Sequence, residues 1–266
     1  MIRPAIEVRA VSSVAEYHAC VALQEEVWGT AFDSVPASML QVATYVGGLC
    51  LGAFSTDGEL LGIVFGLAGE MDGRPTHWSH LLGVREAARN QGVGRLLKAH
   101  QRDVLASRGI REMCWTFDPL IARNAHLNLN LLGARVVRYV PDMYGTTRSP
   151  LHHGLATDRL LVACTTAAAH PGHPTSLPDL AGAPIMTPEP RPGDRVLQPG
   201  ADRPTTLRIE VPSDFVLLAA GRPDVARKWH GAVRQHFTWA LDAGYAVTGL
   251  ERDPLTSRTC YTLATR

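Results

Sequence analysis

Lysine is nearly absent from this chain of 266 residues. It occurs only at Lys98 and Lys228, although lysine and arginine together number 26. With 24 glycines and 18 prolines, this bias indicates a GC-rich bacterial genome, not arginine selected for anion binding. The 25 acidic residues leave a net charge of +1, which gives no electrostatic argument for nucleic acid or an anionic membrane as partner.

Long apolar runs and paired cysteines are also missing. No run approaches the roughly 18–20 residues of a membrane helix, and the chain does not open on the apolar stretch of a signal peptide. The five cysteines are odd in number, scattered and without a CxxC pair. They indicate reduced, mostly buried thiols in a cytoplasmic protein, and argue against a disulfide framework or structural zinc. The adjacent His152 and His153 lack clustered acidic or thiol partners, so no metal is expected.

Residues 5–165 alternate strand-like and helical stretches, which predicts a mixed α/β core. Ser12 or Ser13 can cap the first helix, and Asp57-Gly58 predicts a hairpin turn. The expected strands are 6–11, 48–54, 60–67, 77–84, 111–117 and 134–140. The expected helices are 14–28, a short one near 36–42, 92–108 and 120–132.

The texture changes after Cys164. Residues 165–205 hold nine of the 18 prolines and no sustained periodicity, which predicts a linker or an arm on the surface. Residues 206–266 then offer a strand, a helix from Pro223 to Ala243 and two closing strands. We expect three parts: a core of residues 1–165, a proline-rich linker or arm of 166–205, and a C-terminal α/β extension of 206–266. The extension would pack on the core or on a second subunit.

The most informative stretch joins the strand ending at Val84 to the helix that follows. It contains Arg89-Asn90-Gln91-Gly92-Val93-Gly94-Arg95. Glycines at 92 and 94 let the backbone come close to a ligand, and the N–H groups of the first helical turn favour an anion such as a pyrophosphate. Arg89 and Arg95 could add charge-assisted contacts. The alternative is a glycine turn that only starts a helix.

Residues 89–94 match the Q/R-x-x-G-x-G/A loop of the GNAT superfamily of acyl-CoA-dependent acyltransferases, which the chain resembles over residues 5–165. More specific runs, among them Trp115-Thr116-Phe117-Asp118-Pro119-Leu120, are similar to a bacterial group of GNAT acyltransferases, and so is the C-terminal segment. A dinucleotide-binding fold fits less well, because three strands precede the glycine loop.

The resemblance implies a central mixed, mostly antiparallel sheet flanked by helices. It implies acetyl-CoA or another short acyl-CoA as co-substrate, held where the strands of Val84 and Trp115 diverge. The residues implied to bind it are Leu82, Val84, Arg89, Asn90, Gln91, Gly92, Val93, Gly94, Arg95, Asn124 and Asn128. Asn124 and Asn128 are four apart and so are expected on one helix face, where a capping or loop-pinning role is the alternative.

The chain departs from the GNAT pattern at the general acid. Many relatives carry a tyrosine four residues before the glycine that ends the fourth helix, and counting back from Gly133 gives Leu129. Tyr144 and Tyr139 follow that helix and are candidate replacements. For each of them, aromatic packing is an equally good interpretation.

His80 is the first candidate for the general base, because a group with a pKa near 7 suits that role. It has the same parity as Leu82 and Val84 and is therefore expected on the same strand face. A hydrogen-bonded histidine of the core is an equally favoured interpretation of His80. Asp118 and Glu70 are further candidates, although Asp118 before Pro119 also suits a turn. Arg159 could clamp an acceptor carboxylate or pair with an aspartate.

These features together predict an N-acyltransferase that moves an acetyl or succinyl group directly to the amine of a small metabolite, an amino acid being the first guess. No cysteine or serine has the surroundings of a catalytic nucleophile, which favours direct transfer. The alternative is a non-catalytic GNAT-fold protein that binds acyl-CoA or a metabolite, which the missing tyrosine keeps open. Acylation of protein lysines is a third interpretation, and a homodimer stays open.

Overall fold

The computed structural model describes residues 6–30, 33–145, 154–167, 182–200, 203–254 and 256–265. His152 and His153 lie outside these residues. The chain forms two compact units. The first unit comprises Met1–Trp115 and Cys164–Ala168, and the second comprises Thr116–Ala163 and Ala169–Arg266. The boundaries fall inside two strands, so each unit is described by itself.

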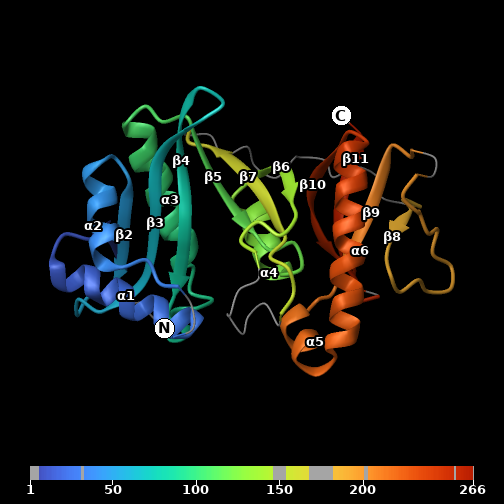
Figure 1. Cartoon of the computed structure of the whole chain (residues 1–266), viewed down its shortest axis with the longest axis horizontal. Coiled ribbons are helices and arrows are strands. Elements are labelled where there is room, and N and C mark those ends of the chain that lie inside the picture. Colours follow the sequence, from blue (N-terminus) through green and yellow to red (C-terminus); the bar gives the residue numbers. More distant parts are fainter. Residues whose placement is uncertain are drawn as a thin grey trace. The chain divides into compact units, whose positions relative to one another are not determined.

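The first unit is a mostly antiparallel sheet with helices on both faces (Figure 1). Strands β1 to β4 pair antiparallel in chain order, and β4 pairs parallel with β5. Its strands are β1 (Glu7–Ala10), β2 (Leu49–Phe54), β3 (Leu60–Met71), β4 (Arg74–Val84), the start of β5 (Glu112–Phe117) and the end of β7 (Arg159–Thr165). Its helices are α1 (Val14–Trp28), α2 (Ala37–Tyr45), the short 3₁₀ helix η1 (Glu86–Ala88) and α3 (Val93–Ser107).

The two faces of this sheet are assigned by what neighbouring positions on β4 contact. A Cβ placed on Gly83 would meet Trp28 and Leu23 of α1, and Leu81 belongs to the buried cluster beneath α1 and α2. On β3, a Cβ at Gly62 would meet Leu97 and Val93 of α3 instead. The α1–α2 layer and α3 therefore cover opposite faces.

Local signals in the sequence explain where these elements begin and turn. Ser13 caps α1 by accepting a hydrogen bond from the backbone of Glu16, whose carboxylate accepts one from the backbone of Ser13 in return. This capping box confirms one of the two predicted caps. Gly58 turns with a φ of 82° between β2 and β3, which confirms the predicted hairpin.

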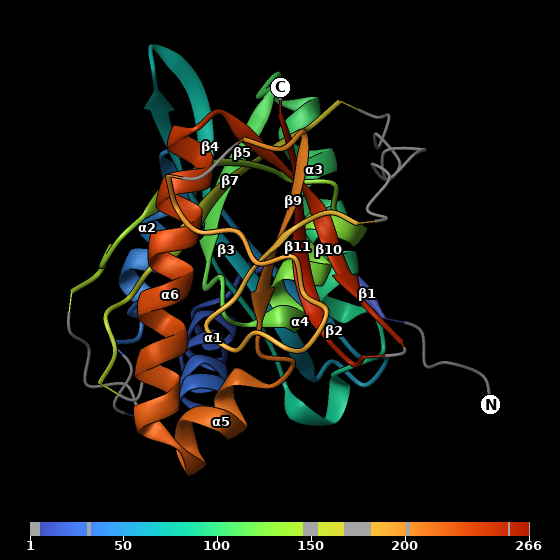
Figure 2. The ribbon, with the colours of Figure 1, turned by 90° about the vertical axis from the view of Figure 1, so that its right-hand side faces the viewer.

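The second unit contains a four-stranded sheet in the order β10-β11-β9-β8 and an antiparallel pair of β6 and β7. Figure 2 shows the long α6 running alongside β9, β10 and β11. Its further strands are β6 (Arg135–Val140), β8 (Ile185–Met186), β9 (Thr206–Val211), β10 (Tyr245–Arg252) and β11 (Thr259–Thr265). Its helices are α4 (Ala122–Ala125), the π-helix η2 (His126–Leu131), α5 (Phe215–Gly221) and α6 (Pro223–Asp242).

Side chains from residues 116–163 and from the C-terminal segment pack together within this unit. The Tyr261 hydroxyl donates to the carbonyl of Pro119 at 2.7 Å. The rings of Tyr139 and Phe237 stack with centroids 5.7 Å apart. The Asn130 amide bonds both backbone groups of Leu250, at 2.7 and 3.0 Å.

The structure confirms the predicted fold class, mixed α/β with a large, mostly antiparallel sheet flanked by helices. Two details differ from expectation. The helix predicted over 120–132 is four residues of α-helix followed by a π-helix. The stretch predicted as a linker or surface arm contains β8, which pairs parallel with β9, and residues 183–187 around it are buried. The predicted three-part division of the chain stays a prediction.

Candidate functional site

The loop from β4 to α3 has a backbone that only a few residue types adopt readily. Asn90 has a φ of 62° and Gly92 a φ of 85°, both in the left-handed region. A Cβ at Gly92 would meet nothing within 4 Å, so crowding does not explain the glycine. The left-handed backbone conformation is what favours glycine there. The loop continues from η1 to Gly92, directly before the first residue of α3.

The N-terminus of α3 has no side-chain cap. Gly92 is the N-cap residue, and no side chain accepts from the first helical N–H groups. Those groups and the helix dipole therefore present partial positive charge to the outside. Arg89 and Arg95 beside it are exposed. The arrangement can bind an anion.

Packing within the protein does not explain the glycine at 94. A Cβ placed there would lie 3.7 Å from Leu82 and 3.8 Å from Val84, which are ordinary contacts. Alanine would therefore fit this fold. Glycine at this position leaves the backbone open to close approach by a ligand.

The nearby arginines divide into one that is occupied and two that are available. Arg85 pairs with Glu26 at 3.0 Å and donates to the carbonyl of Leu60 at 2.7 Å, so it fixes the loop to the sheet. Arg89 donates only its Nε, to the carbonyl of Val84 at 3.3 Å. The guanidiniums of Arg89 and Arg95 form no ion pair within the described part of the chain, which leaves them for a ligand.

The pairing of β4 with β5 stops early. It is confined to His77 with Met113 and Trp78 with Cys114. Beyond Trp78, β4 continues to Val84 paired only with β3. Leu82 and Val84, predicted to face the acyl-CoA, lie on this unpaired stretch. In the first unit, the pairing of β4 with β5 therefore ends just before Trp115, as expected for the divergence of strands that the resemblance implies.

The predicted face of His80 is wrong. A β-bulge falls here, because Phe65 pairs with Leu81 while its neighbour Gly66 pairs with Ser79, which leaves His80 as the extra residue. Its ring lies edge-on to Phe65, 6.1 Å between centroids, in the cluster of the α1–α2 face. Leu82 and Val84 lie on the α3 face. His80 is exposed but its ring is partly shielded, and that desolvation lowers its pKa. Its role as base stays a prediction.

The bulge also turns a set of polar side chains towards α3 that the sequence did not reveal. Lys98 Nζ donates to Ser79 Oγ at 2.7 Å and lies 4.0 Å from the centroid of the Trp115 ring. Ser79 Oγ donates to Gln101 Oε1 at 3.0 Å, and Gln101 Nε2 lies 3.1 Å from His77 Nε2. Desolvation, with the nearby charge of Lys98, lowers the pKa of His77 to about 4. All four side chains are buried.

Asp118, in the second unit, is held as a turn residue. Its Oδ1 accepts from the backbone N–H of Leu120 at 2.8 Å, and its Oδ2 lies 3.7 Å from Arg159. Burial raises the pKa of Asp118, and the Arg159 charge opposes that shift. The contact agrees with the predicted aspartate partner of Arg159. Glu70 is exposed and pairs with Pro75 of β4. Pro75 is five residues from His80, so Glu70 and His80 are separated by about 16 Å of strand.

The π-helix changes the spacing on which the shared face of Asn124 and Asn128 was predicted. Asn124 lies in α4 and Asn128 in η2, where a turn is longer than 3.6 residues. Asn124 is half-buried and Asn128 buried. Leu129, at the position of the expected tyrosine, is also buried. Asn130, which no sequence motif singles out, ties this segment to β10.

The two candidate tyrosines have different surroundings. Tyr139 donates to Asp158 Oδ2 at 2.5 Å, and burial together with this carboxylate raises its pKa. It is therefore a structural group. Tyr144 is 47% exposed, and its hydroxyl lies 3.2 Å from Thr116 Oγ1. Of the two, Tyr144 is the one that remains available.

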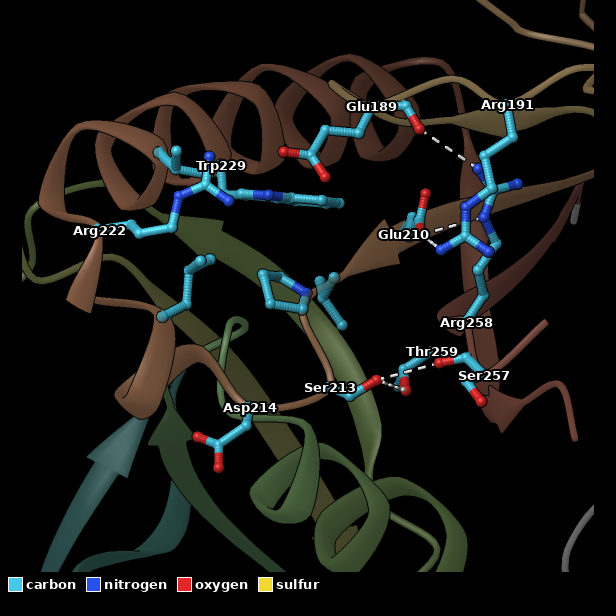
Figure 3. A pocket seen from close by; sticks show the side chains of 14 residues that line it. Glu189, Arg191, Glu210, Ser213, Asp214, Arg222, Trp229, Ser257, Arg258 and Thr259 are labelled. Carbon is cyan, nitrogen blue, oxygen red and sulfur yellow. Dashed lines mark hydrogen bonds and ion pairs between the residues drawn. The ribbon is translucent and has the colours of Figure 1, made fainter. Parts of the chain in front are cut away.

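A separate pocket of about 250 Å³ lies within the second unit (Figure 3). Arg222 and Trp229 stand on one side of it, and Glu210, Arg191 and Arg258 on the other. Arg258 Nε lies 3.1 Å from Glu210, and its other nitrogens bind Asp194. No residue predicted for the acyl-CoA site lines this pocket.

Within the ranges that the structure describes, no three histidine, cysteine or acidic residues are grouped so as to hold a metal ion. None of the described helices combines the length and apolarity needed to cross a membrane. None of the five cysteines forms a disulfide, and all five are buried.

No protein-family model matches the chain, and no curated protein matches it. Among solved structures, it is similar to a ribosomal-protein alanine N-acetyltransferase from Escherichia coli, at 16% identity and a TM-score of 0.49, over 63% of this chain and 97% of that one. An aminoglycoside 6'-acetyltransferase type Ii has the same identity and TM-score, over 62% of this chain and 99% of its own. An N-acetyltransferase from Staphylococcus aureus matches at 11% identity and a TM-score of 0.49, over 61% of this chain and 99% of that one. Likeness at this distance supplies no argument about activity, which rests on the chain's own residues.

Proposed function

We propose that this protein is a GNAT-type N-acyltransferase that moves an acetyl or succinyl group from coenzyme A to the amine of a small metabolite, with an amino acid as the first candidate. The observation that carries the proposal is the uncapped N-terminus of α3 behind the left-handed Gly92, within the Arg-x-x-Gly-x-Gly order of the acyl-CoA loop. Two further observations support it: packing does not require glycine at 94, and the pairing between β4 and β5 ends after Trp78.

Direct transfer, without an acyl-enzyme, is supported by the state of the cysteines. All five are buried. Desolvation raises the pKa of Cys164, and that of Cys260 to about 12. A thiol that stays protonated is a poor nucleophile. The acceptor amine therefore attacks the thioester itself.

Two variants at one position test the anion site. Gly94→Glu puts negative charge into the first turn of α3, where it stabilises the helix but repels a pyrophosphate. Gly94→Gln has nearly the same size without the charge. We expect Gly94→Glu to weaken acetyl-CoA binding by at least about fivefold relative to Gly94→Gln, given a repulsion of roughly 1–4 kcal/mol between charges about 4 Å apart.

Calorimetric titration with acetyl-CoA measures the affinities, and thermal melting shows that both variants are folded. Equal affinity in the wild type and both variants would overturn the site. Release of coenzyme A thiol with a panel of primary amines then tests turnover. The buried Leu129 favours the second candidate, a protein that binds acyl-CoA without turnover. Tight binding with no thiol release for any amine would decide for that candidate.

A further inference from the structure

Lys98 is a buried cation without an anionic partner. Its residue is 3% exposed, and it forms no ion pair within the residues that the structure describes. The buried Arg258, by contrast, pairs with both Asp194 and Glu210. A buried charge without a carboxylate is costly, so such a group tends to lose its proton. Desolvation lowers the pKa of Lys98 to about 7, although Cys164 acts in the opposite direction.

The place of Lys98 in the sheet is as unusual as its burial. It reaches from α3 to Ser79 on β4 and to the ring of Trp115 on β5. Both residues come directly after the last paired residues of these strands, Trp78 and Cys114. Nζ therefore lies where the two strands begin to diverge. Under the proposed function, that divergence receives the thioester end of the acyl-CoA.

We propose that Lys98 is the acid that returns a proton to the coenzyme A sulfur, in the role for which this chain lacks a tyrosine at 129. This inference rests on the proposed function. As the acceptor nitrogen bonds to the acyl carbon, the C–S bond breaks and its electron pair passes to sulfur. The sulfur takes a proton from the Lys98 ammonium. The neutral amine then regains the proton that the acceptor nitrogen gives up, so the exchange balances.

The surroundings hold Nζ in place without neutralising it. The Ser79 hydroxyl donates its hydrogen bond to Gln101 Oε1, so its oxygen accepts from the Lys98 ammonium. The Trp115 ring favours a cation over its face. The titratable neighbours are His77 on β4, which stays neutral, and Cys164 on β7, itself influenced by Glu112 and Arg102. Lys98 can therefore exchange a proton near neutral pH.

The near-absence of lysine makes a direct test practical. With ¹³C at the lysine ε-carbons, the protein gives two signals, and the exposed Lys228→Arg variant assigns them without touching the core. The pH titration of the Lys98 signal is recorded in the free protein, with coenzyme A and with desulfo-coenzyme A. We expect the two ligands to give apparent Lys98 pKa values about 1 or more units apart, because only one of them places a titrating sulfur beside the amine.

Identical titrations with the two bound ligands would overturn the inference and leave the proposed function standing. If neither ligand binds in calorimetry, the proposed function itself is overturned. With an acceptor in hand, Lys98→Met should keep the KM for acetyl-CoA and lower kcat by about 10²–10⁴-fold, with loss of the basic limb of the pH–rate profile. Lys98→Arg should not rescue that limb, since a guanidinium does not release its proton.

Discussion

Arg234→Met is expected to destabilise the second unit, because it removes the main charged partner of the buried Asp158. The Asp158 side chain is 2% exposed, and Arg234 donates to both of its oxygens, at 2.8 and 2.5 Å. Methionine replaces the aliphatic stem of arginine, which packs along α6, and lacks only the guanidinium end. The variant therefore removes the charge and its hydrogen bonds more than it removes contacts.

The magnitude follows from what remains around Asp158. Breaking a fully buried ion pair costs about 3–5 kcal/mol. Arg234 is 37% exposed, and Tyr139 and the backbone of Asp142 still donate to the carboxylate, while His230 lies 3.5 Å away. We therefore expect a loss of about 2 kcal/mol, below the range for a fully buried pair. Urea denaturation should show a lower midpoint with an unchanged slope.

The loss should depend on pH with a defined sign. Burial alone would raise the pKa of Asp158, but the hydrogen bonds from Arg234, Tyr139 and the Asp142 amide lower it overall. A carboxyl with a lowered pKa in the folded state stabilises the protein fully above its unfolded pKa of about 3.9, and this is lost as the pH falls through the folded value. The gap between wild type and Arg234→Met should therefore shrink below about pH 4.

Arg227→Met is the matched control, since Arg227 is exposed on the same helix. It should change the free energy of unfolding by less than about 0.5 kcal/mol. The double variant Asp158→Asn with Arg234→Met should be more stable than the sum of the single losses predicts. A loss in Arg234→Met no larger than in Arg227→Met, or a gap from the wild type that is as large at pH 3 as at pH 7, would refute this account of the cluster.

Three further outcomes are expected. Asn130→Ala leaves both backbone groups of the buried Leu250 unpaired and should cost about 2–4 kcal/mol in urea denaturation. Asn124→Ala should cost far less, since the Asn124 side chain forms no hydrogen bond with the residues that the structure describes. Truncation after Cys164 should give an insoluble or strongly destabilised product; a soluble fragment that melts cooperatively with unchanged acetyl-CoA affinity would show a detachable tail. His80→Gln should keep acetyl-CoA binding but lower turnover by about 10²–10⁴-fold, and a mutant that keeps the acidic limb of the pH–rate profile would assign the base elsewhere.

The sequence could predict the β4–α3 loop because its signals are local. Glycine at a left-handed position and a helix that starts behind it depend on residues next to each other in the chain. The same holds for the capping box at Ser13 and the Asp-Gly hairpin, both of which the structure confirms. Each of these features depends on the backbone preferences of residues that are neighbours in the sequence.

The face of His80 could not be predicted, because it depends on a bulge in the pairing of β4 with β3. Strict alternation places His80 with Leu82 and Val84. One extra residue in β4 reverses the alternation below that point, so Ser79 and His77 face α3 instead. The sequence of β4 alone does not reveal that His80 has no paired residue on β3. The buried polar set around Lys98 was missed for the same reason.

The helix after β5 shows a second limit, because its repeat departs from 3.6 residues per turn. Residues 126–131 adopt a π-helix, and Asn130 in it bonds both backbone groups of Leu250, 120 residues later. A π-helix inserts one residue into the helical repeat, which displaces the faces expected from 3.6-residue spacing. The shared face predicted for Asn124 and Asn128 therefore rested on a regular α-helical repeat, which the π-helix replaces.

The scarcity of lysine gains a chemical meaning once Lys98 is placed. As composition, two lysines among 26 basic residues indicate only a genome that favours arginine. In the structure, one of the two is buried at the point where β4 and β5 diverge, with a hydroxyl and an aromatic face as its neighbours. Arginine there would stay charged at any accessible pH, whereas lysine can give up its proton when desolvated. A chain that uses arginine almost everywhere thus has lysine at the buried position where proton exchange would be needed.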